Sequence, residues 1–123
     1  MGNPVLDLFG KVLMSEVRDR TIFQWEGNIE GRTKSPHSQE IYRNLQHLDH
    51  KEKAYMKQLF SEVVDTTLHF LLSLIEENEQ IDVAFHTDTN KTVSMTEISD
   101  GLAGELYTED GWISRFSKYA DVM

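Results

Sequence analysis

Apolar residues recur at helical spacing along most of this chain. Near the start, Asn3-Pro4 supplies a capping side chain followed by proline at the first helical position. Apolar residues three or four positions apart then predict a helix over about 4–19. The same pattern can run on as far as Trp25, and Gly27 and Gly31 bracket its end because glycine commonly terminates helices.

Two further starting signals follow a loop rich in glycine and basic residues. Ser35-Pro36 repeats the first signal and predicts a short helix over about 36–47. Asp49 and Glu52 have the spacing of a capping box, which predicts the start of a longer helix. We expect this helix to cover about 50–77.

After Gln80 the pattern changes to β-branched residues in rough alternation, which favours a hairpin near 81–95. Thr96 then caps a predicted fourth helix and Thr108 a last one. The sequence therefore predicts a mostly α fold in one domain, 1–123. Four to five helices would pack around a long central helix at about 50–77, with a small β-hairpin beside them.

The long helix is apolar over an unusually wide arc. On a helical wheel this arc covers about 220°, far more than a one-sided amphipathic helix needs. Its members are Leu59, Phe60, Val63, Val64, Thr67, Leu68, Phe70, Leu71, Leu72, Leu74 and Ile75. We therefore expect neighbours on two sides, with Val64, Leu68, Leu71 and Ile75 buried. The remaining arc is polar and holds Glu62, Asp65, Thr66, His69, Ser73 and Glu76.

Charge is distributed unevenly along the chain. The 123 residues carry a formal net charge of −9. Residues 1–57 hold nine Lys or Arg and eight Asp or Glu, whereas residues 58–123 hold three and thirteen, so the two parts carry +1 and −10. A field of this sign repels nucleic acid and anionic membranes and attracts basic proteins or divalent metal ions.

The leading functional hypothesis is binding without catalysis. The polar arc of the long helix offers Glu62, Asp65, His69 and Glu76 as a surface for a basic protein partner. Bacterial immunity proteins and inhibitors of enzymes that handle nucleic acids have this general character: they are small, poor in cysteine and strongly acidic. This is a likeness in general type and not a match to a family. A binding protein of this type needs no cofactor.

A second hypothesis comes from paired carboxylates. Glu76 and Glu79 close the long helix, and Glu97 and Asp100 open the next predicted helix. Carboxylates three positions apart share a helix face, and two such helices can hold Mg²⁺ through oxygen ligands. The arrangement over residues 76–100 resembles the pattern of the all-α nucleotide pyrophosphatases of the MazG kind. That resemblance implies a magnesium-dependent nucleotide hydrolase with these four ligands.

A third hypothesis is an obligate homo-oligomer, in which the mildly basic N-terminal half of one copy meets the acidic half of another. The chain has no cysteine, which fits a reducing compartment, so we expect a cytoplasmic protein. Its longest apolar stretches are shorter than a membrane span, so we expect no membrane partner. The three hypotheses predict different working surfaces.

Overall fold

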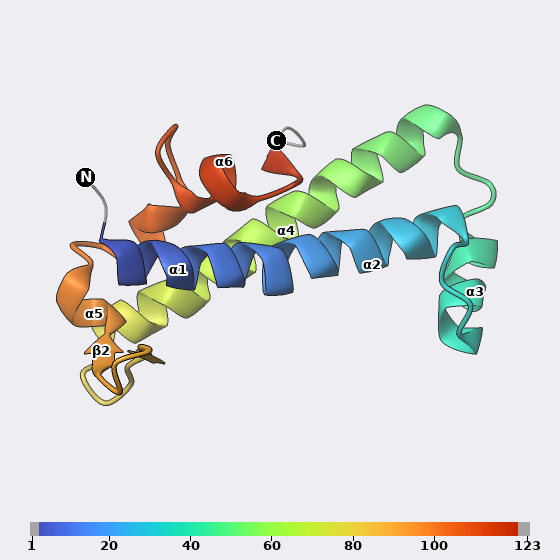
Figure 1. Ribbon diagram of the computed structural model, residues 1–123. Helices are drawn as coiled ribbons and strands as arrows, with labels where there is room; N and C mark the ends of the chain where they lie inside the picture. The colour runs from blue at the N-terminus through green and yellow to red at the C-terminus, as the bar shows by residue number, and fades with distance from the viewer. Residues whose placement is uncertain (1–2, 121–123) are drawn as a thin grey trace.

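Two long antiparallel helices form the frame of the protein. The computed structural model describes residues 3–120, and Figure 1 shows the two helices lying across each other. The first consists of α1 (Pro4–Leu13), a π-helical segment η1 (Met14–Arg18) and α2 (Asp19–Glu30), which follow one another without a break. The second is α4 (His50–Glu77). The short helix α3 (Pro36–Asn44) joins them at one end.

The starts of these helices lie where local sequence signals predict them, whereas the first long helix continues to Glu30, past the predicted end near residue 19, and α3 ends at Asn44 rather than near residue 47. The Asn3 side chain accepts hydrogen bonds from the backbone N–H groups of Val5 and Leu6. Gly31 ends α2 with φ of 79°, a conformation that glycine adopts without steric cost. Asp49 and Glu52 form both hydrogen bonds of the capping box, which confirms the predicted bounds of the long helix.

The π segment keeps the buried residues of the first long helix on one side of that helix. Its buried residues Leu6, Gly10, Met14, Arg18 and Ile22 are spaced by four. In a regular α-helix this spacing drifts by about 40° at each step, or about 160° over the whole set. A π turn takes up one extra residue and removes about 100° of that drift. The sequence pattern gives no sign of this segment.

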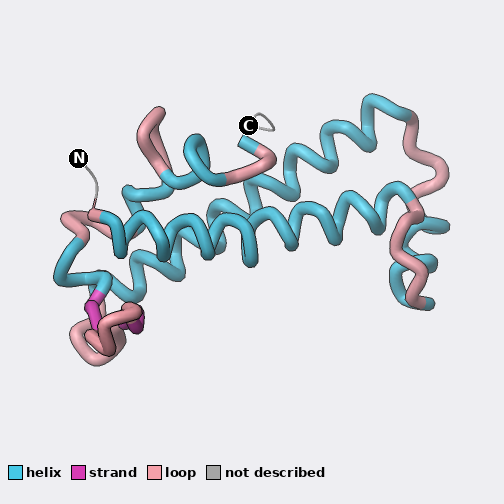
Figure 2. Tube along the Cα trace, in the orientation of Figure 1, coloured by secondary structure: helices cyan, strands magenta, loops and turns pink. Residues whose placement is uncertain are grey.

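The remaining described residues cover one end of the pair of long helices (Figure 2). Strands β1 (Ala84–His86) and β2 (Thr92–Ser94) form an antiparallel hairpin, with Phe85 opposite Val93. Helix α5 (Met95–Ile98), the 3-10 helix η2 (Ala103–Leu106) and helix α6 (Trp112–Phe116) follow. The prediction of a mostly α fold with a small hairpin is confirmed.

The predicted bounds of the last two helices are wrong. The fourth helix is broken into α5 and η2, because Ser99–Gly101 leave helical geometry and the Ser99 hydroxyl instead bonds the Glu105 carboxylate. Thr108 does not cap the last helix. It adopts a positive φ of 75°, and α6 begins after Gly111.

Within residues 3–120, the contiguous hydrophobic core cluster lies at the covered end of the long helices, and Ile22 and Ile29 of α2 are buried apart from it. Its buried members come from α1, η1, the second half of α4 and the C-terminal elements, and are Leu6, Met14, Leu68, Leu72, Ile75, Met95, Leu102, Ala103, Leu106, Trp112 and Ile113. The Trp112 indole lies directly on the backbone of α1 at Gly10, where a Cβ atom would overlap the ring. At the other end, the first eleven residues of α4 include no buried side chain.

The long helix α4 has neighbours on two sides, α2 and η2, as predicted, but they cover only part of its apolar arc. Its buried residues form one narrow seam, Ser61, Asp65, Leu68, Leu72 and Ile75, with the spacing of a coiled-coil contact. Leu68 and Ile75 are buried as predicted, whereas Leu71 is exposed. The wide apolar arc thus divides into a covered and an uncovered part. Among the described residues, no helix is long and apolar enough to cross a membrane.

Candidate functional site

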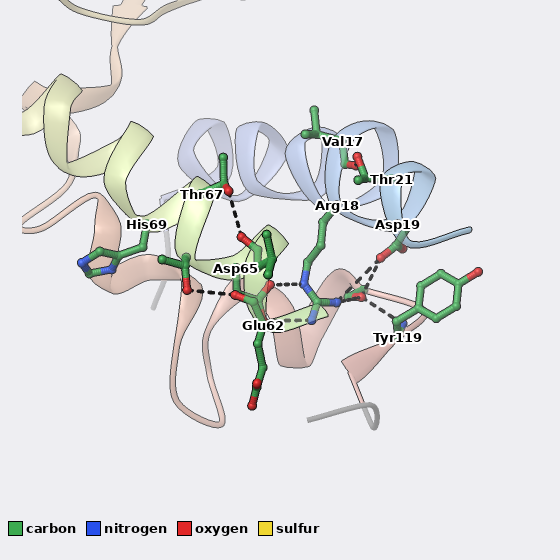
Figure 3. A network of polar contacts seen from close by, with 12 residues as sticks. Val17, Arg18, Asp19, Thr21, Glu62, Asp65, Thr67, His69 and Tyr119 are labelled. Carbon is green, nitrogen blue, oxygen red and sulfur yellow. Dashed lines mark hydrogen bonds and ion pairs between the residues drawn. The ribbon is translucent and has the colours of Figure 1, made fainter. Parts of the chain in front are cut away.

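A buried ion pair connects the two long helices at their centre. Arg18 is 0% exposed, and its guanidinium donates from Nε to Asp65 Oδ1 at 2.6 Å and from Nη2 to Asp65 Oδ2 at 3.2 Å. Figure 3 shows this two-pronged contact between η1 and α4. Burying two charges is costly unless each one is paired and hydrogen-bonded, and this geometry meets that condition.

The same network fixes the end of the described chain. Arg18 Nη1 donates to Ser117 Oγ at 2.7 Å, and Ser117 Oγ donates to Asp19 Oδ1 at 2.6 Å. Asp19 Oδ2 accepts from the backbone N–H of Lys118 at 2.9 Å. The residues after α6 are therefore held to the junction of η1 and α2 by several linked hydrogen bonds.

The predicted surface for a basic partner is corrected by this network. Asp65 lies in the buried seam of α4, since its carboxylate is neutralised by Arg18, 47 positions earlier in the chain. His69 Nδ1 lies 3.0 Å from the Tyr107 hydroxyl. Burial, followed by the charge of Asp65, raises the pKa of Tyr107, so this phenol stays protonated at neutral pH. Glu62 is the member of the set that extends freely to solvent.

Glu76 also has an internal role. Its carboxylate accepts the backbone N–H of Leu102 at 3.2 Å and that of Ala103 at 3.1 Å, at the start of η2. Orphan N–H groups at a helix start favour such a carboxylate. Glu76 therefore connects the end of α4 to the C-terminal elements.

The four carboxylates of the magnesium hypothesis do not come together as a ligand set. Within residues 3–120, no group of three or more histidine or acidic side chains is arranged to hold a metal ion. Glu76 is occupied with η2, and the break after α5 separates Asp100 from the helix that would align it with Glu97. The geometry thus offers no support for the ligand set Glu76, Glu79, Glu97 and Asp100.

One side of α4 is apolar and exposed. Val63 is 63% exposed and Phe70 66% exposed, although both belong to the apolar arc. The side chains on this side follow one another at spacings of three and four, so they form a continuous stripe. Its α4 members are Leu59, Val63, Thr67, Phe70, Leu71 and Leu74.

A groove extends this apolar surface onto the neighbouring helix. Its volume is about 420 Å³, and it lies between the first long helix and α4. Val17, Thr21 and Trp25 line one wall, while Phe60, Val63, Val64, Thr67 and Leu68 line the other. In Figure 3, Val17 and Thr67 point away from the side on which Glu62 extends. We call the stripe and the groove together the open face.

The sequence reveals the chemistry of the open face but not its exposure. All of its apolar members belong to a pattern that also predicts a core, and spacing alone cannot tell a covered side from an uncovered one. Arg18 was likewise missed as a functional partner of Asp65. Its only signal is a charged residue among the apolar positions Met14, Val17 and Ile22.

A search of protein-family models, of curated proteins and of solved structures finds no match to this chain.

Proposed function

We propose that this protein is a non-catalytic protein-binding module that docks a helical layer of its partner on the open face. The observation that carries the proposal is the exposure of Val63 and Phe70 beside an apolar groove. Large apolar patches on folded proteins mark interaction surfaces, because leaving them in water is unfavourable. A groove between two helices fits an apolar helix ridge, which packs between them.

The polar groups of the molecule support binding more than catalysis. Arg18, Asp65 and Asp19 hold structural elements together, and Glu76 binds two backbone N–H groups. A catalytic acid or base needs to reach a substrate in a cleft. These groups instead satisfy one another inside the fold.

The acidic region of the chain favours a partner with a basic surface and attracts that surface to one end of the molecule. Residues 76–110 contain ten acidic side chains and one basic side chain, Lys91, so this end of the molecule carries −9. Such a field speeds the approach of a basic surface and weakens as salt rises. The prediction of a basic partner therefore moves from the polar arc of α4 to this end of the molecule.

Site-specific cross-linking tests the proposal. A photo-reactive residue replaces Val63, and in a control protein it replaces Glu62, which is exposed on the side of α4 opposite Val17 and Thr67. In extracts of the native cells we expect one defined product from position 63, with its second chain identified by mass spectrometry. Phe70→Glu should abolish that product. The proposal is wrong if position 63 reacts no more specifically than position 62, or if Phe70→Glu leaves the product unchanged.

A further inference from the structure

From the open face we infer that the partner is a second copy of this chain, docked antiparallel about a two-fold axis near Thr67. This inference rests on the proposed function and names its partner. Each copy would contribute α4 and its first long helix as one layer. The two layers would pack face to face, with their apolar grooves facing each other. Two observations support this occupant: the missing second layer and the distribution of charge.

Within residues 3–120, the half of the frame near α3 has no second layer beyond the contact of α2 with the short helix α3. The core cluster is confined to the end covered by the C-terminal elements, and at the α3 end Ile22 and Ile29 are the buried apolar residues of α2. Most helical stability in proteins comes from packing an amphipathic face against another layer. A second copy supplies that layer without requiring any other protein.

The charge distribution selects the antiparallel arrangement. The α3 end, residues 20–57, carries seven basic and five acidic side chains, a net of +2, whereas residues 76–110 carry −9. Figure 1 shows these two regions at opposite ends of the long helices. A parallel dimer would place one acidic end over the other. An antiparallel dimer places each acidic end over a mildly basic one, which removes that repulsion.

The axis position follows from the stripe itself. Leu59 and Leu74 are its outer members, so a two-fold axis midway between them passes near residues 66 and 67. Leu59 of one copy then lies near Leu74 of the other, and Val63 of one copy lies near Phe70 of the other, about 5 Å along the helix from the axis. A charge placed at position 63 would enter the interface twice, once from each copy.

Molar mass measured by light scattering tests the pairing. The purified wild-type chain should elute as a dimer, and Val63→Glu should elute as a folded monomer with an unchanged circular dichroism spectrum. We expect this substitution to raise the dissociation constant at least about a hundredfold. Gln58→Glu adds the same charge on the polar side of α4 and should change it less than about threefold. A monomeric wild type overturns the inference, as does a Val63→Glu protein that still dimerises.

Cysteine cross-linking tests the orientation, because the chain contains no cysteine of its own. Leu59→Cys and Leu74→Cys chains are mixed and oxidised. The antiparallel arrangement predicts 59–74 disulfides between copies, whereas 59–59 and 74–74 products would overturn it. If the wild type is monomeric but position 63 captures a different protein in cells, the second copy is excluded and the binding function stands. If no specific partner is captured either, both are wrong.

Discussion

The two sides of α4 have similar apolar chemistry and different surroundings. On the covered side, Leu68, Leu72 and Ile75 belong to a core closed by the C-terminal elements. On the open face, Leu59, Phe70 and Leu74 belong to the same apolar arc of the helix but face solvent. The pattern of a helix records which sides need a neighbour, but it does not say whether that neighbour is in the same chain.

The largest expected effect is a loss of folding stability when the buried pair of Arg18 and Asp65 is broken. Asp65→Ala leaves the Arg18 guanidinium buried without its carboxylate, and we expect a loss of about 3–5 kcal/mol in the free energy of unfolding. Denaturant titration measures this loss. The double substitution Arg18→Met with Asp65→Leu should recover most of it, because no unpaired charge remains. A loss below about 1 kcal/mol for Asp65→Ala would show that Arg18 finds water or another partner.

A matched pair of leucines compares the two sides directly. Leu72 is 1% exposed and Leu74 is 47% exposed, two positions apart on one helix. In the Val63→Glu background, which removes pairing, Leu72→Ala should cost about 2–5 kcal/mol and Leu74→Ala less than about 1 kcal/mol. Thermal and urea unfolding provide the values. Equal costs would mean that the open face is covered within the monomer.

A smaller effect is expected where α6 closes the covered side. Gly10→Ala places a methyl group against the Trp112 indole and should cost about 1–3 kcal/mol through overpacking. Gly104→Ala is the control, since a Cβ atom there meets no described atom within 4 Å. Denaturant unfolding of both variants gives the comparison. A Gly10→Ala protein as stable as Gly104→Ala would show that Trp112 can move away from α1.

The smallest expected effect is a pH dependence in the hairpin at the covered end. The Asp82 carboxylate accepts hydrogen bonds from Ser94 and Thr96, and these, Ser94 foremost, lower its pKa below the usual 3.8. A lowered folded-state pKa stabilises the fold above pH 3.8, and this contribution is lost as pH falls through the lowered value. Asp82→Asn should therefore melt slightly below wild type at neutral pH, with the gap closing in acid. A gap that persists in acid would contradict this account.

The sequence predicts the frame well because local signals determine it. Asn3, Ser35 and the pair Asp49–Glu52 cap their helices through side chains only two or three positions from the groups they bind. Such contacts depend on short spacings, and these can be recognised in a single sequence. The bounds of α4 were predicted for this reason.

The candidate surfaces depend on contacts that no local pattern encodes. Asp65 pairs with a residue 47 positions away, and the phase of the first helix depends on the π segment that contains Arg18. An apolar arc about 220° wide also leaves open which part the chain covers. The sequence therefore favours the polar arc as the binding surface, whereas the structure leaves part of the apolar arc uncovered.

The dependence of the melting temperature on protein concentration tests the central claim most directly, because only a folded state that associates is stabilised by mass action. Wild type and Val63→Glu are melted over the same dilution series. We predict that the melting temperature of the wild type rises with concentration while that of Val63→Glu stays constant. A wild-type melting temperature that does not change with concentration would contradict the proposal that a second copy covers the open face.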